Sequence, residues 1–192
     1  MPKKERKLVH IFTDEEIHII YINLKSIRDR LIFALAYDCG LRRIEITRIQ
    51  LKDIHKGFIT IWGKGNKYRL VPFGAFTSDL IESYLKYEHT HKSDYLILTK
   101  YGKPFTVNGL SNFFRKLSKT SGIDLSAHQF RHNFATNYLI NQIENGSSDL
   151  FQLQLLLGHA DAEVTKNYLH LAQEQLLVKK SYSHLDNKKH LL

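Results

Sequence analysis

The spacing of apolar residues is the feature that most constrains the fold of this 192-residue chain. Ile27, Leu31 and Leu35 recur at the interval of one helical turn, and similar stripes run along most of the sequence. Thr13 and Glu16 have the spacing of a capping box and mark the start of the first helix. The expected helices are Asp14–Leu24, a second from Ile27 that Gly40 ends, Arg43–Ile49, Thr77–Glu88, one through Leu110, Phe113, Phe114 and Leu117 that stops at Gly122, one through Phe130, Phe134 and Tyr138, Asp149–Leu157 closed by Gly158, and Ala172–Ser183.

The period of the pattern changes in the stretch between Gly57 and Pro72. Gly57–Trp62 and Tyr68–Pro72 predict two strands, and the loop Gly63–Lys67 joins them as a hairpin. Tyr95–Leu98 has the composition of a further short strand. We therefore expect an α+β fold that is mainly α, with a small antiparallel β-sheet, rather than alternating βαβ units.

Length and composition fit one globular domain. Hydrophobic residues make up 43% of the chain and charged residues 24%, which is ordinary for a soluble protein. No apolar run approaches the length of a membrane span, and no signal peptide follows Met1. The single cysteine, Cys39, excludes an internal disulfide and fits a reducing compartment, so we expect a cytoplasmic protein.

The charge of the chain favours a polyanionic partner. Lysine and arginine number 28 against 19 aspartates and glutamates, which gives a net charge of +9 at pH 7. Such a balance is typical of nucleic-acid binding, although a basic protein that is merely soluble has the same composition. A membrane surface is a weaker candidate, because no helix combines a lysine-rich face with an aromatic apolar face.

Several familiar sites can be excluded from the sequence. Gly63-Lys64-Gly65 lacks the serine or threonine that follows the lysine of a P-loop. His128 and His132 have the spacing of a zinc helix, but Gln129 stands where a hydrolytic zinc site needs a glutamate, and Arg131 would repel the metal. We therefore expect neither a metal nor a cofactor.

Four separated segments place cations or a phenol beside glycines or helix ends. Each residue in them has an ordinary explanation when taken alone: a surface arginine, a turn lysine, a capping histidine, or one of ten tyrosines packed at the edge of a core. The four segments are Gly40-Leu41-Arg42-Arg43-Ile44-Glu45, the hairpin loop with Lys64, His128-Gln129-Phe130-Arg131-His132, and Leu157-Gly158-His159 with Tyr168 nine residues after the histidine.

Taken together and in this order, the segments resemble the catalytic domain of the tyrosine recombinases, the phage integrase family. The resemblance runs from about Thr13 to Tyr182 and rests on Gly-Leu-Arg-x-x-Glu, Gly-Lys-Gly-x-Lys-x-Arg, His-x-x-Arg-His and Leu-Gly-His with its distant tyrosine. It implies the tyrosine-recombinase catalytic fold over residues 13–185, between a basic N-terminal extension (1–12) and a basic tail (186–192). It also implies double-stranded DNA as the partner and a bacterial or phage origin. The implied function is site-specific DNA recombination, the integration or excision of a mobile element.

The resemblance implies roles for seven residues. Arg42 and Arg131 match the two arginines that bind the phosphate, which suits a planar, always charged guanidinium. Glu45 matches a supporting acid that orients the arginines or the first histidine. The remaining matches are Tyr168 as the nucleophile that forms a 3′-phosphotyrosyl link, His128 as a proton-transfer group, Lys64 as the acid for the leaving 5′-oxygen, and His159 as a further phosphate donor.

The chain also departs from the family pattern. The N-terminal core-binding domain that usually precedes the catalytic one is expected to be absent, which puts unaided strand exchange in doubt. The stretch Asn141–Ser148 suggests a loop insertion between helices. Family members assemble as tetramers on DNA, so we expect a monomer in free solution and a homo-tetramer on DNA, with Ala172–Leu185 docking either on its own domain or on a neighbour.

Two other functions remain open from the sequence. One is DNA relaxation by a type IB topoisomerase, which uses the same tyrosyl chemistry, and the other is a non-catalytic DNA-binding fragment. The His-x-x-Arg-His and Leu-Gly-His motifs favour site-specific recombination over the first. The filled catalytic positions favour it over the second.

Overall fold

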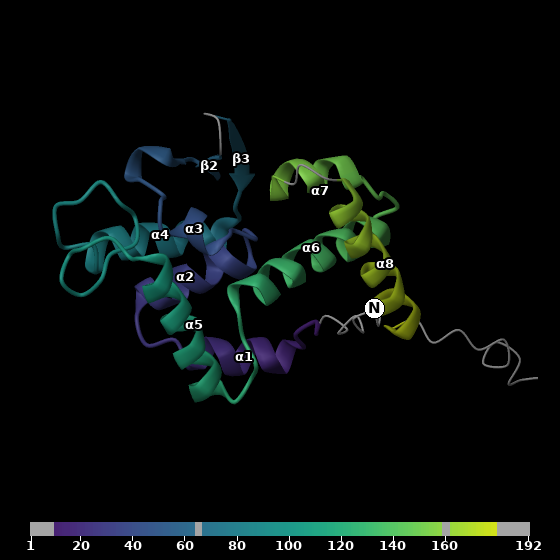
Figure 1. Ribbon diagram of the computed structural model, residues 1–192, viewed down its shortest axis with the longest axis horizontal. Coiled ribbons are helices and arrows are strands. Elements are labelled where there is room, and N and C mark those ends of the chain that lie inside the picture. Colours follow the sequence, from purple (N-terminus) through teal and green to yellow (C-terminus); the bar gives the residue numbers. More distant parts are fainter. Residues whose placement is uncertain (1–9, 64–66, 159–161, 180–192) are drawn as a thin grey trace, which may run out of the picture.

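The computed structural model describes residues 10–63, 67–158 and 162–179. The fold over these residues is mainly helical with a small sheet, as the sequence predicts (Figure 1). None of the described helices is long and apolar enough to cross a membrane. The elements are α1 (Asp14–Ile22), α2 (Ile27–Tyr37), α3 (Arg43–Ile46), the 3₁₀ turn η1 (Leu51–Asp53), β1 (Ile54–His55), β2 (Phe58–Trp62), β3 (Tyr68–Pro72), α4 (Ala75–Tyr87), α5 (Val107–Ser121), α6 (Ala127–Glu144), α7 (Leu150–Leu157) and α8 (Ala162–Lys179).

Local capping explains where many of the helices begin and end. The capping box predicted at Thr13 is confirmed: its hydroxyl accepts from the backbone N–H of Glu16, and the Glu16 carboxylate accepts from the N–H of Thr13. Gly122 and Gly158 take the left-handed conformation directly after α5 and α7, at the predicted stops. The caps therefore fix the helix ends on which the site is built.

The sheet is a three-stranded antiparallel meander in the order β1-β2-β3. The predicted hairpin is confirmed, with Ile59 opposite Val71 and both side chains buried. The short strand β1 was not predicted, because two residues are too few to show an alternation of apolar and polar side chains. The strand expected over Tyr95–Leu98 is wrong: this segment makes only isolated bridges, since its apolar residues insert into the core as a loop.

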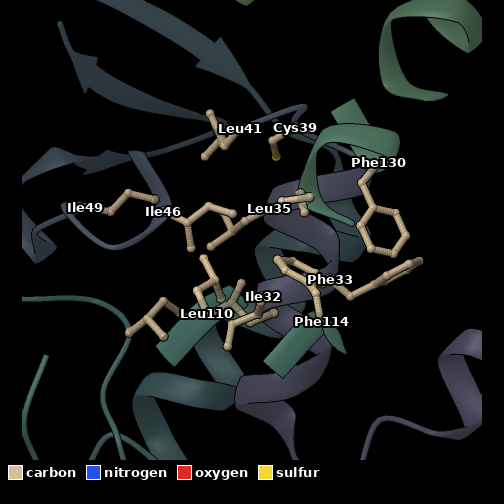
Figure 2. Packing of buried hydrophobic residues seen from close by; sticks show 14 of the residues in the cluster. Ile32, Phe33, Leu35, Cys39, Leu41, Ile46, Ile49, Leu110, Phe114 and Phe130 are labelled. Atoms are coloured by element: carbon tan, nitrogen blue, oxygen red, sulfur yellow. The ribbon is translucent and has the colours of Figure 1, made fainter. Parts of the chain in front are cut away.

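Two hydrophobic clusters meet along α6. The larger surrounds α2, and Figure 2 shows Phe33, Phe114 and Phe130 packed together beside Leu35. The smaller joins the second half of α6 to α7 and α8 through side chains such as Leu139. Because α6 belongs to both clusters, residues at its first turns have a fixed position relative to α3 on one side and α8 on the other (Figure 1).

The largest differences from the predicted helix boundaries are in α8 and α6, whereas the bounds of α1, α3 and α4 differ by three residues or fewer at each end. The last helix begins at Ala162, well before the expected Ala172, because its buried face starts with Thr165 and Tyr168, which do not look like core residues in the sequence. The expected loop over Asn141–Ser148 is wrong in its first half, since α6 continues to Glu144 and its Ile143 packs against the smaller cluster.

Candidate active site

A cleft of about 450 Å³ lies where α3, α5, α6 and α8 meet. It brings together four of the seven site residues that the sequence predicts, although they come from three distant parts of the chain. Lys64 and His159 lie outside the described residues. The lining residues are Arg42, Arg43, Ile44, Val107, Ala127, His128, Arg131, His132 and Tyr168.

Arg42 sits at the N-cap position of α3, where the chain leaves the buried Leu41. Its backbone N–H donates to Oε2 of Glu45 at 2.8 Å, so the carboxylate caps the short helix. Its Nη1 atom donates to Oε1 of Glu45 at 3.0 Å and to the carbonyl oxygen of Leu157 at 3.2 Å. The side chain is 39% exposed, which leaves the other guanidinium face open to the cleft.

Arg131 lies on the first turns of α6 and is only 3% exposed. Its Nη1 atom donates to the carbonyl oxygen of Gly40 at 2.7 Å, and Nη2 donates to that of Leu157 at 2.5 Å. Burial, together with the positive charge of Arg42, lowers the pKa of Arg131 to about 10. The guanidinium therefore stays charged at neutral pH, and these two backbone carbonyls hold it in place.

The C-terminal end of α7 is a shared acceptor for the arginines. The carbonyl oxygen of Leu157 accepts from both Arg42 and Arg131, and the carbonyl oxygen of Leu156 accepts from Nε of Arg69 at 2.7 Å. The last carbonyls of a helix lack intrahelical partners and carry the negative end of its dipole. This helix end therefore offsets the mutual repulsion of the guanidinium groups.

Glu45 and Arg69 form an ion pair next to Arg42. Arg69, on β3, donates from Nη1 and Nη2 to the two oxygens of Glu45, each at 2.9 Å. Burial alone would raise the pKa of Glu45, but the hydrogen bonds and charges of Arg69 and Arg42 together outweigh it and hold the pKa below its usual value. Arg69 was not among the predicted site residues, although it is the last residue of the Gly-Lys-Gly-x-Lys-x-Arg motif.

Two histidines stand on one face of α6 beside the arginines. The ring centroids of His128 and His132 lie 4.1 Å apart, edge to face. Burial, followed by the charge of Arg131, lowers the pKa of His128, and burial with the neighbouring His128 lowers that of His132 to about 4. Both rings are therefore neutral at pH 7, and a neutral His128 can accept a proton.

Tyr168 projects from α8 into the wall of the cleft and is 4% exposed. Its ring centroid lies 5.2 Å from that of His132. Burial raises the pKa of the phenol, even though the charges of Arg131 and Arg42 act in the opposite direction. The hydroxyl is therefore protonated at neutral pH and needs a proton acceptor before it can act as a nucleophile.

The cleft combines fixed positive charge with a phenol and a neutral imidazole. Within the described part of the chain, no group of three histidine, cysteine, aspartate or glutamate side chains is arranged to hold a metal ion. Two guanidinium groups on one side of the cleft suit an anionic, tetrahedral group such as a phosphate. The arrangement can therefore bind a phosphodiester and present the tyrosine to it.

Comparisons with known proteins show the family and the fold of the chain. A model described as "Phage integrase family" matches residues 10–175. The tyrosine recombinase XerC of Staphylococcus epidermidis strain RP62A is 38% identical over 187 residues, and the alignment covers 91% of this chain and 62% of that protein. XerC of Staphylococcus aureus strain RF122 is 36% identical, with 91% and 61% covered. The chain thus spans about three fifths of the length of the curated relatives that it matches.

Solved structures share the fold. The crystal structure of XerA recombinase superposes with a TM-score of 0.79 at 24% identity, covering 93% of this chain and 67% of that one. XerH recombinase bound to its palindromic difH substrate, in a post-cleavage complex, gives 0.72 at 26% identity, with 94% and 55% covered. The catalytic domain of bacteriophage HP1 integrase gives 0.65 at 20% identity, with 93% and 98% covered.

Proposed function

This chain belongs to the phage integrase family, and we propose that it cuts and rejoins DNA strands through a covalent 3′-phosphotyrosyl link to Tyr168. The observation that carries the proposal is the single cleft shared by Arg42, Arg131, His128 and Tyr168. The same four positions match the motifs of the family in the same order along the chain. These positions are stabilised by the C-terminal end of α7, by the ion pair of Arg69 with Glu45, and by the two hydrophobic clusters along α6.

We propose that the two arginines stabilise the charge that develops during attack. Displacement at a phosphodiester places negative charge on the two non-bridging oxygens, and fixed donors aimed at that charge lower the barrier. Arg42 has a face open to the cleft, while the hydrogen bonds of Arg131 to the carbonyl oxygens of Gly40 and Leu157 orient its guanidinium. In this role the pair supplies the electrostatic stabilisation that a metal ion gives in other phosphoryl-transfer enzymes.

The protonation states of Tyr168 and His128 support a defined order of steps. Tyr168 starts protonated and His128 starts neutral, so His128 takes the phenolic proton as the tyrosine oxygen bonds to phosphorus. The bond from phosphorus to the 5′-oxygen breaks, and that oxygen leaves as a hydroxyl after it gains a proton, which we assign to Lys64. The reverse attack by a 5′-hydroxyl rejoins the strand, so no high-energy cofactor is consumed. His159 is proposed as a further phosphate donor.

The relatives support site-specific recombination of double-stranded DNA as the overall reaction. Solved structures show XerH with its difH substrate, a lambda integrase dimer with a core site, and the Tn1549 transposon integrase with circular intermediate DNA. The net charge of +9 fits a DNA partner. We propose that the chain works as a homo-tetramer on two duplexes, since breaking and rejoining four strands requires four tyrosines.

A trapping assay tests the proposal. The substrate is a pool of duplexes with a nick beside a randomised core, so that the short fragment released by cleavage diffuses away and rejoining fails. Wild-type protein should give a DNA adduct that survives SDS, and Tyr168→Phe should give none while retaining DNA binding. Wild-type protein that binds the pool without any adduct contradicts the proposal. Relaxation of supercoiled plasmid without a specific site would instead indicate topoisomerase activity.

A further inference from the structure

We propose that Arg69 is a further positioning residue for strand cleavage, which sets the orientation of Arg42 and Arg131 through two separate contacts. The inference rests on the function proposed above and deepens it. Arg69 is absent from the lining of the cleft, so it acts through other residues and not on the DNA. Its position on β3 brings the sheet against both α3 and the end of α7 (Figure 1).

The first contact is with Glu45. The two terminal nitrogens of Arg69 donate to the two carboxylate oxygens in a fork, at 2.9 Å each, and both side chains are largely buried, at 14% and 9% exposure. The same two oxygens accept from Nη1 and the backbone N–H of Arg42. Glu45 therefore divides its charge between two arginines. Without Arg69, the carboxylate would bind Arg42 more tightly and compete with a phosphate for it.

The second contact is with the end of α7. Nε of Arg69 donates to the carbonyl oxygen of Leu156, and the next carbonyl, that of Leu157, accepts from Arg42 and Arg131. Gly158 follows with φ of +61°, and a Cβ atom there would lie 3.1 Å from Nη1 of Arg69. The glycine therefore lets the helix end rest directly on the Arg69 guanidinium.

Lysine cannot replace Arg69 in both contacts. A guanidinium carries three nitrogens in one plane, and Arg69 uses all three, two toward Glu45 and one toward Leu156. An ammonium is a point charge on a flexible stem and would keep the charge while losing this geometry. Arg69→Lys thus separates positioning from net charge.

Arg28 provides a matched control elsewhere in the fold. It is a partly buried arginine on α2 that pairs with Asp29 at 2.9 Å and lies over the ring of Phe105. Arg28→Lys removes a guanidinium of similar burial from a place that does not touch the cleft. Any effect of Arg69→Lys that Arg28→Lys shares is a general effect on stability.

The first test uses the free protein and needs no activity. The Nε–Hε signals of Arg42 and Arg131 in ¹⁵N-edited NMR spectra should shift in Arg69→Lys and stay in place in Arg28→Lys. Unchanged signals in Arg69→Lys would overturn the inference, whatever the protein does to DNA. If wild-type protein forms no adduct at all, the proposed function fails, and the spectra still decide whether Arg69 positions the two arginines.

The second test measures cleavage under single-turnover conditions with the trapping substrate. Arg69→Lys should slow adduct formation by about 10²-fold, the size of effect expected from a small misplacement of catalytic groups, while the Kd for DNA changes little. Combining it with Glu45→Gln should slow the reaction by less than the product of the two single effects, because the two residues share one contact. Equal rates in Arg69→Lys and Arg28→Lys, or fully additive losses in the double variant, would overturn the inference.

Discussion

The imidazole ring of His132 lies 5.2 Å from the phenol ring of Tyr168 and connects the helix of Arg131 to the helix of the proposed nucleophile. On its other side His132 meets His128 edge to face at 4.1 Å. Its Nδ1 atom is buried and has no hydrogen-bond partner among the described residues. The ring therefore packs between His128 and Tyr168 in its uncharged form, since a second positive charge beside Arg131 would be costly.

We predict that acid destabilises the protein through His132. Burial and the neighbouring His128 lower its folded-state pKa to about 4 from the ordinary 6.5, so between these values the unfolded chain binds more protons than the folded one. The free energy of unfolding should fall as the pH drops from about 6.5 toward 4. Urea titrations at pH 7 and pH 5 should show a smaller difference for His132→Gln than for wild type. An equal difference in both would assign the acid sensitivity to other groups.

Replacing either of the two arginines that are proposed to bind the phosphate with lysine should slow cleavage, and the two variants should differ in stability. We expect Arg42→Lys and Arg131→Lys each to reduce the rate of adduct formation by about 10²-fold, as loss of an oriented donor does elsewhere. Arg131→Lys should also lower the free energy of unfolding by about 1–3 kcal/mol, because the carbonyl oxygen of Gly40 loses its guanidinium donor and that of Leu157 loses one of its two donors. Cleavage by Arg42→Lys at the wild-type rate would remove Arg42 from the proposed mechanism.

Gly158→Ala should disturb the site more than its backbone cost alone. The left-handed conformation costs a residue with a Cβ atom about 1–2 kcal/mol, and here the added methyl also meets the side chain of Arg69. Gly122→Ala is the control, since Gly122 caps α5 with φ of +73° and has open space around it. Urea unfolding should show losses in both variants, whereas adduct formation should fall only in Gly158→Ala. A similar fall in both would mean that the Arg69 contact is unimportant.

Asn133→Ala should release the start of the chain from the core. The buried Asn133 side chain accepts from the backbone N–H of Phe12 at 2.7 Å and donates to the carbonyl oxygen of His10 at 2.9 Å. Loss of these partners leaves buried backbone groups unpaired, at a cost of about 1–3 kcal/mol. Hydrogen exchange at the amide of Phe12 should accelerate strongly in the variant. Unchanged protection there would show that packing of the Phe12 ring alone holds this segment.

Local signals in the sequence were sufficient for most of the fold. The capping box at Thr13, the stops at Gly122 and Gly158 and the hairpin ending at Pro72 depend on neighbouring residues, and the structure confirms them. The predicted start of α8 was wrong, because the buried face of this helix begins with Thr165. Thr165 is a polar residue, and only tertiary packing reveals that it is buried.

The candidate site, too, was predicted only in part from the sequence. The motifs and their order in the sequence predicted Arg42, His128, Arg131 and Tyr168 as site residues. In the structure these four residues line one cleft. The part played by Arg69 depends on strand pairing, which turns its side chain toward two helices that are distant in sequence. The sequence pattern predicts the hairpin but does not show which helices pack against β3, so only the folded chain reveals these contacts.

Identification of the residue that carries the DNA is the most direct test of the account. After trapping with the nicked substrate and digestion with nuclease and trypsin, mass spectrometry should find the nucleotide remnant on the peptide Asn167–Lys179, which contains Tyr168 as its single tyrosine. The account predicts modification of Tyr168 in wild type and no modified peptide from Tyr168→Phe. A remnant on any other residue, or an undiminished adduct in Tyr168→Phe, would contradict it.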